Sequence, residues 1–382
     1  MSALVVRGGR VIDPARAIDQ VADIAFVDGR AAEPDAEPPA GTEAESFDAT
    51  GLLVVPGLID LHTHVYWGGT ALGVDAGALA RRGGTLTFVD AGSAGPGNFA
   101  GFRAHVIAPS PVRILAYLNI SFAGIFAFSR RVMVGECADL RLLDMVSCRE
   151  VAAAHRDLIV GIKVRVGRAA GGASGLAPLD MAIEVAEALD LPVMAHIDQP
   201  PPSRRAVTER LRPGDILTHC FRPFPNAPVG PGDAVRADVL AARARGVVFD
   251  IGHGAGSFGF DTARTMIAAG FLPDVISSDV HALSIDGPAF DLLETLSKFH
   301  CLGVDLPALI RAATAAPAAA LRRPDLGTLD PAGVGDATLL ELVEGDFSYV
   351  DVDGATLPGR TRLVCRGLIK AGRWLQRPDA SE

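Results

Sequence analysis

The feature that most constrains this chain is a series of eight short apolar runs between about residues 51 and 325. Helix-like stretches such as LDMAIEVAEALD and DAVRADVLAARAR lie between them. Continuous apolar strands separated by helices are typical of a parallel sheet that is covered on both faces. The runs are LLVVPGLIDLH, TLTFVDAG, VRILAYLNI, LIVGIKVRV, LPVMAHI, DILTH, GVVFDIGH and DVISSD.

Eight such runs predict an α/β protein with a (β/α)8 TIM barrel over residues 51–325. The alternative is a doubly wound open sheet, which more often has a glycine-rich turn after its first strand than this sequence does. Residues 1–50 and 326–382 instead indicate short strands with turns, and each end is too short to bury a core alone. We therefore expect both termini to form one small composite β-sandwich domain.

Composition narrows the classes of partner. The 382 residues carry a formal net charge of −10 and no Lys/Arg-rich run, so we expect no nucleic-acid partner. No signal-peptide pattern and no apolar run of membrane-spanning length are present, so we expect no membrane association. Five cysteines without CxxC spacing fit a reducing cytoplasm. The expected partner is a small-molecule substrate, and assembly into a homo-oligomer is left open.

Polar residues close several of the runs, and in a barrel chemistry is located at the C-terminal ends of the strands. His62 and His64 stand two residues apart, so both point to one face and can reach one metal ion. An isolated pair of this kind is as often two hydrogen-bonded core histidines. His196, His219 and Asp279, each at the end of another run, favour the metal site.

Lys163 lies inside the fourth run, where a charged ammonium is costly to bury. The lysine either reaches the rim or pairs with a carboxylate, or its neutral amine takes up CO₂. The resulting carbamate is an oxygen ligand that can bridge two divalent ions. Asp279 either caps the following helix or binds a metal and accepts a proton from water. The sequence has no GxSxG motif and no recognisable cysteine nucleophile motif.

Four more residues are candidate substrate contacts. Arg165 can bind a substrate carboxylate bidentately, unless it forms an ion pair with an Asp or Glu at the barrel rim. Asn119 follows the third run, although turn formation is the commoner role of such an asparagine. His253 lies in the glycine-rich loop GHGAG after the seventh run, and His281 follows the eighth.

With these residues the chain resembles the amidohydrolase superfamily, and more narrowly its dihydroorotase-related amidohydrolase/deacetylase metallohydrolases. The resemblance covers nearly the whole length. The segments that carry it are PGLIDLHTH, VDAGSAG, LNIS, GIKVR, MAHI, RPGDILTHCF, FDIGHGAGSF, SSD and SKFHCLG.

This resemblance implies a centre of two divalent ions, most often zinc. The ligands it implies are His62, His64 and Asp279 for the more buried ion, His196 and His219 for the other, and N6-carboxylated Lys163 between them. The implied reaction is hydrolysis of an amide or ester, deacetylase-like, in an N-acyl or O-acyl carboxylic acid. A metal-bound hydroxide attacks, and Asp279 acts as general base and then as general acid.

Three alternatives are a ring hydrolase of the dihydroorotase or hydantoinase type, a deaminase, and a non-catalytic scaffold. The mononuclear deaminase branch usually has a glutamate three residues after the strand-five histidine, where this chain has Gln199. Retention of all six ligands argues against the scaffold.

Overall fold

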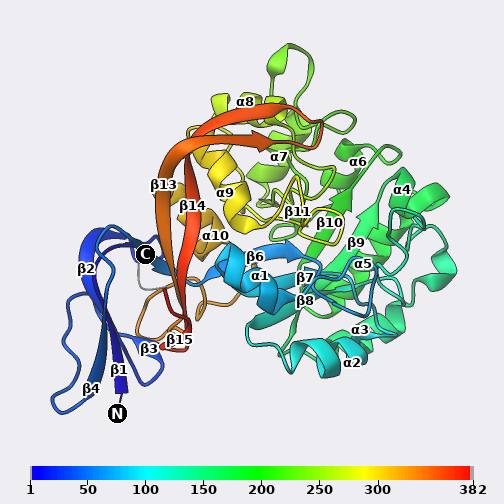
Figure 1. The fold of residues 1–382 in the computed structure, drawn as a ribbon. Helices are drawn as coiled ribbons and strands as arrows, with labels where there is room; N and C mark the ends of the chain where they lie inside the picture. The colour runs from blue at the N-terminus through cyan, green and yellow to red at the C-terminus, as the bar shows by residue number, and fades with distance from the viewer. Residues whose placement is uncertain (1, 379–382) are drawn as a thin grey trace.

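The computed structural model describes residues 2–378 and is built on two sheets (Figure 1). The first sheet is parallel and seven-stranded, in the order β12-β11-β10-β9-β8-β7-β6. Strands that are neighbours in the sequence are neighbours in this sheet, as repeated strand–helix units require. Its strands are β6 (Leu58–Thr63), β7 (Thr85–Ala91), β8 (Arg113–Asn119), β9 (Ile159–Val166), β10 (Val193–Ile197), β11 (Ile216–Leu217) and β12 (Val248–Phe249).

The two edges of this sheet approach the same segment of the chain, residues 275–280. Val275 makes a parallel bridge to Asp250 beyond β12, and Val280 makes one to Thr63 at the end of β6. The backbone N–H of Asp279 also donates to the carbonyl of His62 at 2.7 Å. The predicted parallel α/β architecture is therefore confirmed as a curled parallel sheet. Its eighth run forms isolated bridges where the sequence predicted a regular strand.

Helices follow most of the strands and surround the sheet (Figure 1). Several begin at an aspartate whose side chain accepts a backbone N–H, as Asp75, Asp144 and Asp291 do. The longer helices are α1 (Ala76–Gly83), α3 (Met145–Ala154), α5 (Ala177–Ala188), α7 (Ala237–Ala244), α8 (Phe260–Ala268), α9 (Leu292–Cys301) and α10 (Leu306–Ala313). The shorter ones are α2 (Phe99–Phe102), α4 (Arg168–Gly171), α6 (Arg204–Thr208), α11 (Ala315–Ala320), η1 (Arg103–Ile107), η2 (Leu140–Leu142), η3 (Gly172–Ser174) and η4 (Pro231–Asp233).

The second sheet combines both ends of the chain. Its short strand β5 pairs in parallel with β1 and antiparallel with β13, so Val54 lies between Val11 and Leu339. The strands are β1 (Ser2–Asp13), β2 (Ile18–Val27), β3 (Arg30–Ala31), β4 (Glu43–Asp48), β5 (Leu53–Pro56), β13 (Ala337–Val350), β14 (Thr356–Lys370) and β15 (Arg373–Gln376).

The first apolar run, predicted as one strand, supplies one strand to each sheet. The chain passes from β5 to β6 at Gly57, whose N–H donates to the carbonyl of Asp336 at 2.8 Å. A Cβ at position 57 would lie 2.8 Å from the Asp336 Cβ, so a side chain has no room at this crossing. Periodicity cannot reveal the change of sheet because both halves of the run are buried.

The hairpin of β13 and β14 extends beyond its own sheet and arches over the helices of the first (orange to red in Figure 1). Ser297 of α9 accepts the N–H of Leu363 at 2.9 Å, and Asp351 accepts the N–H of Phe260 at 2.8 Å. In the described part of the chain, no helix has the length and apolar character needed to span a bilayer.

Candidate metal centre

One pocket at the carboxyl ends of the parallel strands brings together all six residues that the sequence predicts as metal ligands. These are His62, His64, Lys163, His196, His219 and Asp279. They come from five separate segments of the sheet, so no single stretch of sequence forms the site.

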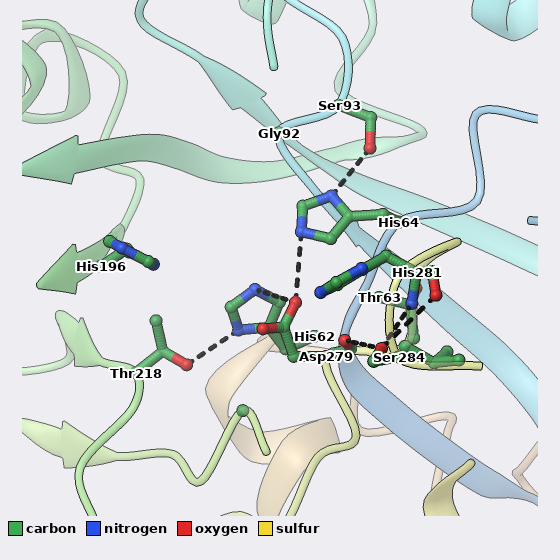
Figure 2. Close-up of polar contacts among 12 residues, drawn as sticks. His62, Thr63, His64, Gly92, Ser93, His196, Thr218, Asp279, His281 and Ser284 are labelled. Carbon is green, nitrogen blue, oxygen red and sulfur yellow. Dashed lines mark hydrogen bonds and ion pairs between the residues drawn. The ribbon is translucent and has the colours of Figure 1, made fainter. Parts of the chain in front are cut away.

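His62, His64 and Asp279 form the tightest group, with one ligand atom of each within 4.8 Å of the others. Asp279 Oδ1 lies 3.3 Å from Nε2 of His62 and 3.3 Å from Nε2 of His64 (Figure 2). Two ligands of a tetrahedral zinc ion, each about 2.0–2.1 Å from the metal, are about 3.3 Å apart. The donor set and the two distances from Asp279 therefore fit a divalent ion.

Electrostatics keep these groups in forms that bind metal. Burial lowers the pKa of His62 well below its usual range and that of His64 to about 3, so both imidazoles are neutral at pH 7. Burial raises the pKa of Asp279 to about 6, against the opposing influence of His281 and Lys163. Asp279 is thus mostly ionised near neutrality but close enough to its pKa to exchange a proton.

Lys163 is fully buried on β9, and its Nζ lies 3.4 Å from His62 Nε2. Desolvation lowers the pKa of Lys163 to about 7, although the negative charge of Asp279 opposes the shift. A substantial neutral fraction of the amine is therefore available at physiological pH. Gly92 makes room for this side chain, because a Cβ at position 92 would lie 2.6 Å from Lys163 Cγ.

His196 and His219 form a second group. His196 Nδ1 and His219 Nε2 are 2.6 Å apart, and their rings are nearly perpendicular. His219 Nδ1 lies 2.7 Å from the carbonyl of Gly252, which can only accept, so Nδ1 carries the proton and Nε2 has the lone pair. Burial lowers the pKa of both imidazoles well below the usual range. The 2.6 Å contact is therefore a hydrogen bond from the Nδ1–H of His196 to His219 Nε2, and His196 would have to give up or move that proton for both nitrogens to bind one ion.

The glycines of the GHGAG loop allow the chain to pass close to these ligands. Gly252 and Gly254 both have positive φ, 46° and 54°. A Cβ at position 252 would lie 2.9 Å from His62 Nδ1, and one at 254 would lie 2.2 Å from Asp279 Oδ2. At positions 252 and 254 the backbone therefore lies so close to the ligands that only glycine fits.

Two of the four expected substrate contacts line the pocket. Arg165 is 7% exposed and its guanidinium lies 4.9 Å from the Phe128 ring centroid. It also donates to Glu136 Oε2 at 3.2 Å, so the rim pairing considered as the alternative is present. His281 lies beside His64, with ring centroids 6.0 Å apart.

The other two are not among the described residues that line the pocket. Asn119 donates to the carbonyl of Gly92 and accepts the N–H of Ser121, which is the turn-forming role. His253 lies between Lys298 Nζ at 2.9 Å and the Gly254 carbonyl at 3.0 Å. Their polar atoms hold backbone and loop in place, so a role in contacting substrate has no support from the geometry.

Sequence reasoning missed the polar residues behind the first histidines. Thr218 Oγ1 lies 2.8 Å from His62 Nδ1 and donates to Asp250 Oδ2 at 2.7 Å. Ser93 Oγ lies 2.9 Å from His64 Nδ1 (Figure 2). Asp250 interrupts the seventh apolar run, GVVFDIGH, and this is a signal that could have identified it.

Comparison with known proteins agrees with this geometry. No protein-family model matches the sequence. A deacetylase of Agrobacterium fabrum is 36% identical over 329 residues, which is 86% of this chain and 80% of that protein. A dihydroorotase of Solibacter usitatus is 53% identical, but over only 64 residues, 16% of this chain and 14% of the relative.

Two solved structures resemble the whole chain. A dihydroorotase crystal structure has a TM-score of 0.88 and 30% identity, and covers 99% of this chain and 100% of that chain. An adenine deaminase crystal structure has a TM-score of 0.90 and 26% identity with the same coverage. The chain therefore belongs to the amidohydrolase superfamily and, within it, to the deacetylase family of metal-dependent hydrolases.

Proposed function

We propose that the protein removes an acyl group, acetyl in the simplest case, from an N-acyl or O-acyl carboxylic acid. One observation carries this proposal. Four histidines, a buried lysine and an aspartate converge on a single pocket in a chain that aligns with a deacetylase along most of its length. Ring hydrolysis of a cyclic amide is less favoured, because the deacetylase is 36% identical over most of the chain, whereas the dihydroorotase structure is 30% identical and the dihydroorotase of Solibacter usitatus aligns over 64 residues only.

We propose that the pocket holds two divalent ions, most simply zinc. His62, His64 and Asp279 would hold one, and His196 and His219 would hold the other. Lys163, carboxylated through attack of its neutral amine on CO₂ with loss of a proton, would link them. When bound, such ions polarise a carbonyl as Lewis acids and lower the pKa of water.

In this proposal, proton transfer and substrate binding are carried out by side chains of the protein. Asp279, poised near pKa 6, accepts a proton from the attacking water and passes it to the leaving nitrogen or oxygen. Arg165 is positioned at the pocket wall to orient a substrate carboxylate. Leu72, Ile125 and Phe128 supply an apolar side to the same pocket.

The test is a screen of N-acyl and O-acyl carboxylic acids of both chiralities with zinc-loaded protein. We expect release of acetate or a related acid. Ammonia release, or opening of a cyclic amide with no acid released from the acyl panel, would refute the proposal in favour of the alternatives. Asp279→Asn should abolish turnover while zinc remains largely bound, and an active Asp279→Asn protein would refute the role of Asp279.

Lys163→Ala tests the carbamate separately. The variant should lose both zinc and activity, with partial rescue by short-chain carboxylates that occupy the vacated position. Full zinc occupancy in Lys163→Ala would refute the proposed bridge.

We infer further that residues 275–280 act as an eighth strand and complete a (β/α)8 barrel over residues 51–325. The bridges from Val275 and Val280 to the two sheet edges support this closure. Residues 1–50 and 326–382, together with β5, which pairs with β1 and β13, would then form the composite β-sandwich domain.

A further inference from the structure

Behind the first ligand group lies a chain of buried hydroxyls and carboxylates. Thr218 is fully buried, and its Oγ1 bridges His62 Nδ1 at 2.8 Å and Asp250 Oδ2 at 2.7 Å. We propose that Thr218 is a positioning residue that holds His62 as the Nδ1–H tautomer, so that the Nε2 lone pair faces Asp279. The inference rests on the proposed metal site, because it concerns the nitrogen with which His62 would bind the ion.

The direction of the chain follows from counting donors, starting at Asp250. Ser277 Oγ accepts the N–H of Gly252 at 3.0 Å, so its own proton is free to donate to Asp250 Oδ1 at 2.6 Å. Thr218 donates its single proton to the other oxygen, Oδ2. Both oxygens of Asp250 therefore have a hydroxyl partner, which is the bonding pattern of a carboxylate that only accepts.

The same count of donors and acceptors fixes the tautomer of the His62 imidazole. Because the Thr218 proton is directed to Asp250, Oγ1 can only accept from His62, which places the His62 proton on Nδ1. Nε2 is left with its lone pair, 3.3 Å from Asp279 Oδ1 and 3.4 Å from Lys163 Nζ. A threonine thus decides which nitrogen of His62 is available to a metal.

A parallel arrangement supports the interpretation. His64 Nδ1 contacts Ser93 Oγ at 2.9 Å, and the backbone N–H of Ser93 donates to the buried carboxylate of Asp90 at 2.7 Å. Both histidines therefore have a hydroxyl at Nδ1, on the side away from Asp279 (Figure 2). At His62 this hydroxyl also donates to a buried carboxylate, that of Asp250.

The experiment compares Thr218→Val, which removes the hydroxyl at nearly constant volume, with Thr218→Ser, which keeps it. Thr295→Val is the matched control, because Thr295 is also fully buried but its hydroxyl donates to the carbonyl of Asp291 in α9. Two properties are measured: zinc affinity by chelator competition, and the protonated ring nitrogen of His62 by ¹⁵N NMR of the metal-free protein. A His62→Asn variant assigns the signal.

We expect zinc affinity to fall about 10- to 100-fold in Thr218→Val, with mixed tautomers at His62. Thr218→Ser and Thr295→Val should keep wild-type affinity and the Nδ1–H form. A Thr218→Val protein with unchanged affinity and an unchanged tautomer would overturn the inference. Wild-type protein that holds the Nδ1–H tautomer but binds no zinc would instead refute the proposed function, so the two failures are distinguishable.

Discussion

Gly254→Ala should damage the site by displacing the side chain of Asp279. A Cβ at position 254 would lie 2.2 Å from Asp279 Oδ2, whereas ordinary contacts begin at 3.4 Å, so the carboxylate must retreat by about 1.2 Å. Misplacement of a reacting group by about 1 Å lowers turnover on the order of 100-fold. Because Gly254 has φ of 54°, alanine also destabilises the backbone by about 1–2 kcal/mol.

The assay is hydrolysis of the best substrate from the acyl panel, together with zinc content and thermal unfolding of the metal-free protein. Gly256→Ala is the matched control in the same loop, because a Cβ at position 256 meets no atom within 4 Å. We expect the control to keep wild-type turnover and zinc content. A Gly254→Ala protein with wild-type turnover would refute the conclusion that this glycine makes room for the carboxylate.

Two further predictions concern buried charges outside the six ligands. Burial lowers the pKa of Lys298 to about 8, so the folded protein binds fewer protons than the unfolded chain between that pH and 10.5, and stability rises with pH there. The free energy of unfolding of wild type relative to Lys298→Met, measured with denaturant, should therefore increase by up to about 3 kcal/mol between pH 8 and 10.5. A difference between the two proteins that stays constant over this pH range would contradict the prediction. Arg165→Met should cost about 3–5 kcal/mol by leaving Glu136 buried and unpaired, and Arg165→Met/Glu136→Gln should recover most of it. Because Arg165 is also proposed to bind the substrate carboxylate, the KM of the double variant for acidic substrates should stay above that of wild type. A KM equal to that of wild type would show that Arg165 serves only in the ion pair with Glu136.

The sequence predicts the six convergent residues because each obeys a local rule. His62 and His64 are two residues apart at the end of a buried strand, and Lys163 is conspicuous inside an apolar run. Their convergence follows from the parallel sheet, in which all strands end at the same edge.

Local rules fail for residues whose role depends on the backbone around them. Asn119 and His253 occupy positions near strand ends like those of the ligands, yet neighbouring carbonyls and amides hold their side chains. The number of free donors and acceptors at such a position depends on loop geometry, which periodicity does not encode. Thr218 illustrates the opposite error, because its partner His62 is 156 residues away and its place directly before His219 does not reveal that contact.

The geometry of the first ligand group depends on pairing between the first and last segments of the sheet. Asp279 reaches the two histidines because its N–H donates to the carbonyl of His62, and the N–H of His64 donates to that of Val280 at 3.0 Å. Buried Asp60 strengthens the same junction by accepting both the N–H and the hydroxyl of Ser278. Asp279 itself has φ of 47°, a left-handed conformation that does not occur in a regular strand. The backbone bonds that join residues 279–280 to the end of β6 therefore also assemble the first ligand group, and a substitution that loosens this junction should weaken metal binding without touching a ligand.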